Sequence, residues 1–467
     1  MKELFTKIAQ EATLAGASCL VYNKGKIVEK LNYGYSSIEN KRKVNNDTVF
    51  RIASVSKIIV ALCIMKLYEE GKIDFLEDVS TYLGFPVRNP KYPDVVINLK
   101  MIMTQTSSIT DGCEEGVNSD INSGYNLING TNEDCTLEDL LSVDGKRFVK
   151  ETYSNYRPGT HFEYANLGTG ILACIVERLT GKYFTEYVKE VVFKPLKLDA
   201  SFVVTDIKSK DVASTYGLVD GQLVLKRDRE RFEKGVYKKF PLGENFRGPA
   251  GGCFISTNGL MKIMIALING GLPIIKPETL DKMMQMAWAG KRQPGSDYTA
   301  KGLQLQITDY FDNRRLWGHF GDAYGVKSYF LFNQKEQIGM VYILNGGGYK
   351  YQENGYCDVH EKMIKATLDK YWHPEIASIF SFKVKEDYGY IFNRKIELDY
   401  KVTKNGVFFS KISLLDALGI NTIDDYDFCN KDAKGMTLDE VVEALKEKYN
   451  FDLQKNDDTY MISYKNL

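Results

Sequence analysis

Two polar residues, Ser54 and Lys57, stand at the head of a segment, 58–68, in which almost every residue is apolar. A helix that is apolar all round has to be surrounded by the rest of its chain, so this segment predicts a central buried helix. A chain of 467 residues, 44% of them hydrophobic, is large enough to supply such a core. Because residues three apart share one face of a helix, Lys57 is expected beside Ser54 at the helix N-terminus.

This pair has the chemistry of a nucleophile and its base. A serine hydroxyl attacks poorly until a nearby base takes its proton. A lysine at the head of an apolar helix is partly desolvated, which favours its neutral, proton-accepting form. The backbone N–H groups of the helix N-terminus favour developing negative charge. Since chance puts about one or two Ser-x-x-Lys patterns in a chain of this length, the pattern needs support from other motifs.

The second motif is Tyr164-x-Asn166, which follows a Pro-Gly-Thr turn and precedes a predicted helix, 167–179. The tyrosine oxygen can share a proton with the lysine, and the asparagine amide can orient the lysine and bind a substrate carbonyl. Two other Tyr-x-Asn patterns begin at Tyr153 and Tyr464. We set the first aside because no helix follows to hold it, and the second because it lies among the last residues.

The third motif is His319-x-Gly321, followed by Asp322. Two strand patterns come next, at 325–332 and 338–344, and the short polar segment between them predicts a hairpin. A strand beside the nucleophile can offer a backbone N–H to a developing oxyanion. We expect the N–H of Asp322 to be one oxyanion donor and the N–H of the nucleophilic serine to be the other.

In this order, Ser-x-x-Lys, Tyr-x-Asn and His-x-Gly resemble the motifs of the serine β-lactamase and penicillin-binding-protein superfamily. The tyrosine of the second motif resembles the class C branch, which includes class C β-lactamases, D,D-peptidases, D-aminopeptidases and esterases. The segments 69–74, 78–83 and 249–257 are also similar to that branch. The resemblance covers about residues 1–372.

The resemblance implies a serine hydrolase that works through an acyl-enzyme on Ser54. Lys57 and Tyr164 are expected to be the other catalytic residues. The substrate-binding residues are expected to be Asn166, His319, Gly321 and Asp322. Class C β-lactamases usually carry lysine where this chain has His319, and that lysine helps to hold a substrate carboxylate. The histidine favours a peptidase, amidase or esterase; the alternatives are a β-lactamase or penicillin-binding D,D-carboxypeptidase, and a protein that binds penicillin or another ligand without turnover.

The order of elements predicts an α+β fold. Strand patterns at 17–22 and 27–33 form a first hairpin, which is expected to join the hairpin after His319 in one antiparallel sheet. Helices at the N-terminus and at 356–372 are expected on one face of that sheet. The stretch 60–240 predicts a mostly helical second lobe, with the candidate site between the two lobes.

Residues 375–467 are predicted to form a small α+β accessory domain behind a catalytic domain at 1–372. The strand patterns lie at 395–402 and 407–410, and the helical patterns at 412–418 and 438–449. This segment bears a faint resemblance to a copper-amine-oxidase N-terminal-like module, which implies a binding or positioning role; a stabilising cap is the alternative.

The composition of the chain indicates which kinds of molecule it is expected to bind. The 61 basic residues balance the 61 acidic ones, so nothing favours nucleic acid, and a small-molecule or peptide substrate is expected. No apolar run approaches the ~20 residues that span a bilayer, and the eight cysteines include no Cys-x-x-Cys pair, which favours a cytoplasmic location. The four histidines lack metal-ligand spacing, so no metal and no cofactor is expected. The oligomeric state is left open.

Overall fold

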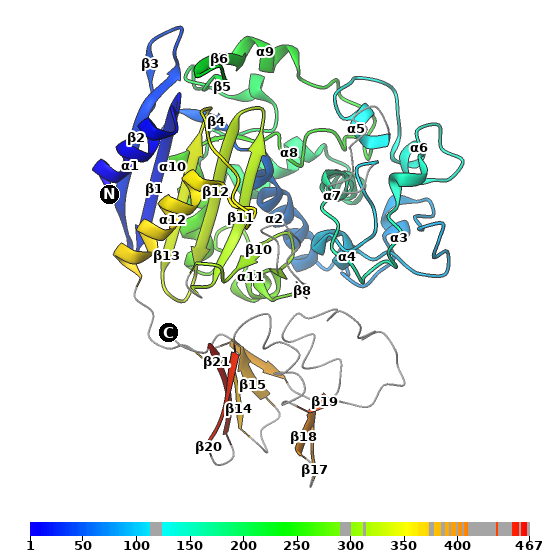
Figure 1. The fold of residues 1–467 in the computed structure, drawn as a ribbon. Coiled ribbons are helices and arrows are strands. Elements are labelled where there is room, and N and C mark those ends of the chain that lie inside the picture. Colours follow the sequence, from blue (N-terminus) through cyan, green and yellow to red (C-terminus); the bar gives the residue numbers. More distant parts are fainter. Residues whose placement is uncertain are drawn as a thin grey trace.

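The computed structural model describes residues 1–112, 124–289, 300–311 and 314–372, together with the backbone of short strands between 378 and 464. Its first 372 residues combine a large antiparallel sheet with a lobe of helices and loops (Figure 1). The predicted α+β class is therefore confirmed. The predicted division at residues 372–375 stays a prediction.

The sheet has nine strands in the order β3-β2-β1-β13-β12-β11-β10-β9-β8. Its strands are β1 (Gly16–Asn23), β2 (Lys26–Ser37), β3 (Arg42–Lys43), β8 (Trp288–Ala289), β9 (Ala300–Lys301), β10 (Gln306–Thr308), β11 (Leu316–Ala323), β12 (Val326–Asn333) and β13 (Ile338–Leu344). The first and last hairpins meet where β1 pairs with β13 in an antiparallel register from Ala17 opposite Leu344 to Asn23 opposite Ile338. The expectation that the two hairpins share one sheet is confirmed.

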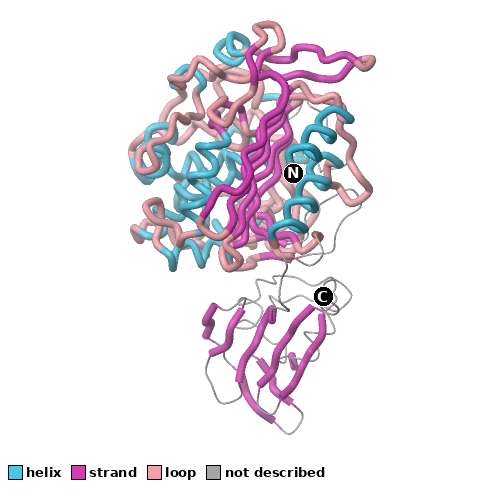
Figure 2. Tube along the Cα trace, turned by 90° about the vertical axis from the view of Figure 1, so that its left-hand side faces the viewer, coloured by secondary structure: helices cyan, strands magenta, loops and turns pink. Residues whose placement is uncertain are grey.

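Two helices from the two ends of this region cover one face of the sheet, as the apolar spacing predicted. They are α1 (Lys2–Glu11) and α12 (Asp358–Tyr371). Their buried residues, among them Phe5, Ile8 and Ile364, form one apolar cluster with side chains of β12 and β13. Figure 2 shows the sheet nearly edge-on, with these helices on one side and the helical lobe on the other.

The predicted central helix is α2 (Ser56–Glu69), and residues 58–65 of it are at most 1% exposed. With α10 (Thr257–Ile268), it belongs to the apolar cluster on the other face of the sheet. The remaining helices of this region are α3 (Val79–Leu83), α4 (Leu99–Thr104), α5 (Gly124–Ile128), α6 (Leu137–Leu141), α7 (Asn166–Thr180), α8 (Phe184–Val188), α9 (Arg229–Lys234) and α11 (Pro277–Met284), with short helical turns at Lys150–Thr152, Lys189–Phe193 and Val204–Asp206. The lobe is mostly helical, as expected.

One hairpin in the lobe was not anticipated. Strands β5 (Thr215–Val219) and β6 (Gln222–Arg227) pair around the two-residue turn Asp220-Gly221, in which both residues have positive φ. Asp-Gly between alternating residues is a strong local signal for such a turn. The signal was present in the sequence, but the stretch 60–240 was expected to be mostly helical, and the hairpin was not predicted.

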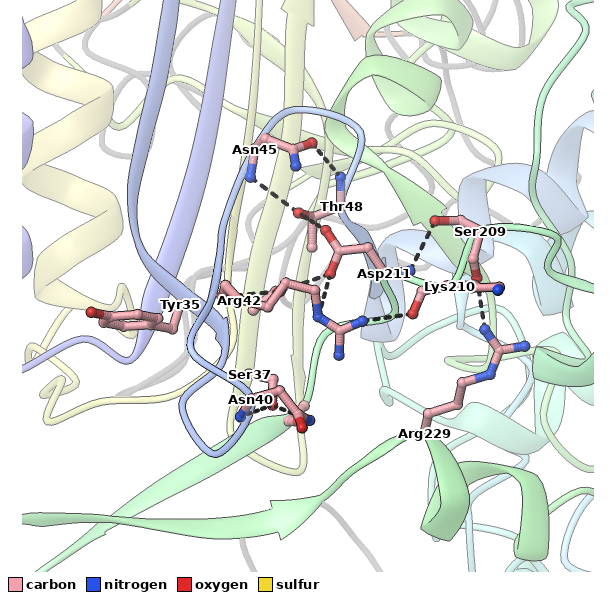
Figure 3. A network of polar contacts seen from close by, with 12 residues as sticks. Tyr35, Ser37, Asn40, Arg42, Asn45, Thr48, Ser209, Lys210, Asp211 and Arg229 are labelled. Carbon is pink, nitrogen blue, oxygen red and sulfur yellow. Dashed lines mark hydrogen bonds and ion pairs between the residues drawn. The ribbon is translucent and has the colours of Figure 1, made fainter.

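A polar network holds in place the segment that leads to the candidate nucleophile, Ser54 (Figure 3). The Asp211 carboxylate accepts hydrogen bonds from Ser36 and Thr48, both 2.7 Å long, and pairs with Arg42. The next residue after Thr48 begins β4 (Val49–Arg51), which pairs with β7 (Phe254–Ser256). The network therefore fixes the position of β4, the strand that precedes Ser54 in the chain.

The C-terminal strands form two further sheets, in the orders β16-β15-β14-β21-β20 and β17-β18-β19. Their bounds are β14 (Ser378–Lys383), β15 (Tyr388–Ile391), β16 (Arg394–Glu397), β17 (Tyr400–Thr403), β18 (Gly406–Phe409), β19 (Met436–Thr437), β20 (Phe451–Asn456) and β21 (Thr459–Tyr464). The expected strand at 407–410 is confirmed. The single strand expected at 395–402 is wrong, because β16 and β17 belong to different sheets and alternation alone does not reveal the break. The helices expected at 412–418 and 438–449 lie outside the described residues.

None of the helices among the described residues combines the length and the apolar character that crossing a bilayer requires. The described cysteines are free and buried. Within the same ranges, no group of three or more His, Cys, Asp and Glu side chains could hold a metal ion.

Candidate active site

The nucleophile candidate, Ser54, lies in a short helical turn, η1 (Ala53–Val55), directly before α2. Ala53 has a φ of 48°, a left-handed backbone conformation that residues other than glycine rarely adopt. The side chain of Ser56 braces this turn, since its hydroxyl donates to the Ala53 carbonyl at 2.6 Å and accepts from the Cys253 N–H at 3.1 Å. Strained backbone of this kind persists where the surrounding structure holds it, and it clusters at functional sites.

Two predicted catalytic side chains converge on the Ser54 hydroxyl. The Lys57 ammonium nitrogen donates to Ser54 Oγ at 3.0 Å, and the Tyr164 hydroxyl donates to the same oxygen at 2.8 Å. Lys57 is fully buried. Burial lowers its pKa from 10.5 to about 7, although the nearby carboxylate of Asp111 opposes the shift. A lysine with such a pKa exchanges protons readily near neutral pH.

Asn166 lies on the other side of the lysine, at the start of α7. Its Oδ1 accepts a hydrogen bond from Lys57 Nζ at 2.8 Å, and the Ala250 carbonyl accepts another from the same nitrogen at 3.0 Å. With the Ser54 bond, these contacts give the lysine three acceptors. The lysine position is therefore fixed by three separate segments of the chain.

Asp111 holds Asn166 in turn. Its carboxylate accepts from the backbone N–H groups of Asn166 and Leu167 and from the Asn166 side-chain amide, at 2.8–3.0 Å. Burial raises the pKa of the Asp111 carboxyl, while these donors and Lys57 lower it. Because every one of these contacts donates a hydrogen to Asp111, they favour its ionised form. Asp111 caps α7 and connects that helix to the lysine.

His319 is the most deeply buried of the predicted substrate-binding residues, with no exposed surface. Its ring centre lies 6.3 Å from that of Tyr164. Burial lowers the pKa of His319 well below its usual value, and the charges of Lys301 and Lys57 lower it further. The imidazole is therefore neutral at physiological pH and lies beside the Tyr164 ring.

Gly321 allows β11 to approach the nucleophile turn. A Cβ atom on Gly321 would lie 2.6 Å from the Ile52 carbonyl oxygen and 3.2 Å from the Ala53 Cβ atom, so no larger residue fits without displacement. Asp322, the next residue, directs its carboxylate away from this contact, toward Lys327 at 2.5 Å and the Tyr351 hydroxyl at 2.5 Å. The oxyanion role expected of the Asp322 N–H stays a prediction.

Together these groups can carry out acyl transfer. The serine oxygen is oriented by two donors, one of which is a lysine able to change protonation state near neutral pH. The close approach of β11 to the serine turn brings together the two backbone segments that carry the expected oxyanion donors.

The sequence model of the beta-lactamase family matches residues 1–356. The chain belongs to the beta-lactamase family. Protein flp from Staphylococcus aureus is 26% identical over 339 residues, which make up 72% of this chain and 60% of that protein. Esterase EstB from Burkholderia gladioli is 28% identical over 204 residues, covering 43% of this chain and 50% of that protein. The match therefore spans 60% or less of the length of both relatives.

Among solved structures, the D-amino acid amidase from Ochrobactrum anthropi shares the fold of this beta-lactamase family member. The two superpose with a TM-score of 0.60 at 19% identity, over 79% of this chain and 97% of that chain. The expected family and fold are thus confirmed.

The rejected Tyr-x-Asn pattern at Tyr153 lies apart from the site of this family member. The Tyr153 hydroxyl donates to the Leu141 carbonyl at 2.9 Å, and its side chain is 1% exposed. Tyr464, the tyrosine of the other rejected pattern, ends β21 in one of the C-terminal sheets, and the rest of that pattern lies outside the described residues.

Two residues near the site were missed by the sequence reasoning. Asp111 caps a helix that begins 55 residues later, so capping rules, which look a few residues along the chain, do not detect it. Lys301 is fully buried on β9, 3.5 Å from Gln105 Oε1, and its charge lowers the pKa of both Lys57 and His319. No motif marked Lys301, and only the pairing of the strands brings it here.

Proposed function

We propose that this chain is a serine hydrolase that cleaves an amide or ester bond through an acyl-enzyme on Ser54. The single observation that carries the proposal is the convergence of Lys57 and Tyr164 on the Ser54 hydroxyl oxygen, at 3.0 and 2.8 Å. The names of two similar proteins, an esterase and a D-amino acid amidase, support hydrolysis of these two bond types.

In the proposed mechanism, the Ser54 proton passes to the Lys57–Tyr164 pair as Oγ bonds to the acyl carbonyl carbon. The backbone N–H groups of Ser54 and Asp322 stabilise the resulting oxyanion. The same pair returns the proton to the leaving nitrogen or oxygen as its bond to carbon breaks. Water then attacks the acyl-enzyme and gives a proton to the pair, and the pair passes a proton to Ser54 Oγ as its bond to the acyl carbon breaks, which releases the acid and the free serine. Asn166 holds the lysine throughout.

The neutral His319 bears on the choice of substrate. A lysine at this position of the family helps to hold a substrate carboxylate, and a buried imidazole with a strongly lowered pKa carries no charge to replace it. We therefore favour peptidase, amidase or esterase activity over turnover of β-lactams. A protein that is acylated once without turnover is the remaining alternative.

The test is the intact mass of the protein after incubation with a fluorophosphonate and, separately, with a penicillin. We expect a fluorophosphonate adduct in the wild type and none in Ser54→Ala. Ser142→Ala, a change at a serine that follows α6, serves as the control and should still be labelled. Labelling of Ser54→Ala would contradict the proposal, and rapid release of a penicillin adduct would favour the β-lactamase alternative.

We further propose that residues 375–467 form an accessory domain that does not contribute catalytic groups. The location also remains a proposal: free, buried cysteines are typical of a reducing compartment such as the cytoplasm.

A further inference from the structure

A cavity of about 230 Å³ lies next to the candidate active site. Its walls include three arginines, Arg51 from β4, Arg227 from β6 and Arg247 from the loop before β7, together with Tyr237 and Tyr324. We call it the arginine cavity. The Ser54 hydroxyl does not line it, so it is a separate space from the point of chemistry.

The positive charges of the three arginines are not balanced by acidic side chains. Among the described residues, none of the three forms an ion pair with a carboxylate, whereas the lysines in the same walls do. Lys238 pairs with Asp134 at 2.6 Å, and Lys239 pairs with Glu186 at 3.4 Å.

The carboxylate of Glu177, which also lines the cavity, is occupied elsewhere. It accepts hydrogen bonds from the backbone N–H groups of Phe184 and Gly243 and from the Asn245 amide, at 2.7–3.0 Å. Because these donors are uncharged, Glu177 keeps its negative charge, but the three arginines outnumber this one carboxylate, so the cavity has an excess of positive charge.

Arg247, which lines this space, has a buried donor without a partner among the described residues. Its side chain is 5% exposed, and two of its nitrogens donate to the backbone carbonyls of Ile128 and Glu133 at 3.2 and 2.8 Å. The third, Nη1, is buried and has no hydrogen-bond partner among the described residues. A buried donor without a partner is unfavourable, and burial also lowers the pKa of Arg247. An anion that accepts from Nη1 would remove this cost.

Arg51 and Arg227 both contact the ring of Tyr324. Their guanidinium carbons lie 4.6 and 4.3 Å from the ring centre. Tyr324 is 49% exposed and forms, with Gly325, the two-residue turn between β11 and β12, in which both residues have positive φ. The hairpin turn thus places an aromatic ring against both guanidinium groups.

The arginine cavity and the catalytic lysine share a wall, the segment 248–252. Ala250 accepts a hydrogen bond from Lys57, and the neighbouring Gly251 accepts one from Arg51 Nε at 2.8 Å. Arg51 also precedes Ser54 by three residues, so their Cα atoms are at most about 11 Å apart. The nucleophile and the cavity wall are therefore neighbours, about the length of a short acyl chain apart.

We propose that the arginine cavity binds a carboxylate of the substrate, so that the enzyme prefers acyl substrates with a negative charge several bonds from the scissile carbonyl. This inference rests on the proposed function. An arginine fork matches a carboxylate with two parallel hydrogen bonds. The volume is below the ~300–1,000 Å³ of pockets for drug-sized ligands, which suits a short acidic group. Because His319 is neutral, a substrate anion has to be bound by another part of the site.

The test compares two p-nitrophenyl esters of equal acyl length, the hexanoate and the monoadipate, which differ in a terminal methyl or carboxylate. The wild type is expected to favour the adipate at least about tenfold in kcat/KM, mainly through KM, because one charged hydrogen bond is worth about that factor. Arg227→Gln and Arg247→Gln should each reduce the adipate-to-hexanoate ratio about tenfold. Arg227→Lys should keep part of the preference.

Arg231→Gln provides the matched control. Arg231 is exposed on α9, donates to the Lys226 carbonyl, and lies outside the cavity walls. Its variant should retain the wild-type ratio. A wild-type enzyme that treats both esters alike, or cavity variants with an unchanged ratio, would overturn the proposal.

Two further readouts separate this proposal from the proposed function. Fluorophosphonate labelling of Ser54 reports the nucleophile alone, so loss of labelling and of both hydrolyses is a failure of the proposed function. In that case adipate should still raise the melting temperature of the wild type and not that of Arg247→Gln. If inorganic phosphate stabilised the protein as strongly as adipate and the ester ratio did not depend on the arginines, the cavity would be a general anion site and the assignment to substrate would be wrong.

Discussion

At the scale of single residues, the proposed mechanism depends on the protonation state of Lys57. The lysine has to be neutral to accept the Ser54 proton, and burial lowers its pKa to about 7. Ester hydrolysis, measured as kcat/KM, should therefore be low at acidic pH and rise as the pH passes through about 7. Because Lys57, Tyr164 and Ser54 share protons, the observed value belongs to the group as a whole.

Asp111→Asn tests this electrostatic link. Asp111 raises the pKa of Lys57, so its neutral replacement should shift the rising limb of the pH profile to lower pH. The plateau value of kcat/KM should fall about tenfold to a hundredfold, because Asn166 loses the carboxylate that orients it. The measurement is the pH dependence of kcat/KM for a neutral ester.

The control for this variant is Asp139→Asn on α6. Asp139 forms a capping box with Thr136 and is not among the groups that shift the pKa of Lys57. Its variant should lose about 1 kcal/mol of stability without a shift of the pH profile. An unshifted profile in Asp111→Asn would show that Asp111 acts only as a helix cap.

At the scale of elements, α7 carries Asn166 and contains two glycines that differ in the space available for a side chain. A Cβ atom on Gly168 would have its nearest neighbour, a methyl group of Ile102, at 3.5 Å, whereas one on Gly170 would lie 2.4 Å from the Phe246 carbonyl oxygen. Gly168→Ala should therefore stabilise the protein by about 0.5–1 kcal/mol, the helix preference of alanine. Gly170→Ala should destabilise it by about 1–3 kcal/mol through overpacking.

Urea unfolding of the two variants against the wild type measures both changes. The pair is matched, since the same substitution is made two residues apart in one helix. Equal effects of the two substitutions would mean that the packing of α7 against the Phe246 segment is looser than the structure indicates.

The elements with strong local patterns were predictable from the sequence. The apolar run of α2, the hairpin patterns of β1–β2 and β12–β13, and the Gly181 signal at the end of α7 all specify their structures locally, and the left-handed φ of 66° at Gly181 fits the predicted stop. The three motifs also singled out Ser54, Lys57 and Tyr164, of which the last two lie within hydrogen-bond distance of the first, while their catalytic roles stay a prediction. The role of Asp111, the place of Lys301 and the arginine cavity depend on contacts between distant segments, which no local pattern encodes.

At the scale of the whole molecule, the pairing of the strands supports the proposed division of the chain. Among the described residues, the strands between Ser378 and Tyr464 pair with other strands of that segment and do not extend the nine-stranded sheet. The candidate site lies wholly before Trp372. These observations support the proposed boundary, since a unit with its own sheet and core can fold by itself.

A chain ending at Trp372 should therefore fold and keep the labelling of Ser54 by a fluorophosphonate, with a melting temperature within a few degrees of the full chain. The matched control is a chain ending at Cys357, which lacks α12. Met363, Ile364 and Leu368 of that helix have no exposed surface, and loss of each buried side chain typically costs about 2–5 kcal/mol. The shorter chain should fail to fold, because that sum approaches the whole stability of a domain. If the chain ending at Trp372 also failed while the full chain folded, residues 375–467 would be part of the catalytic fold and the proposed division would be wrong.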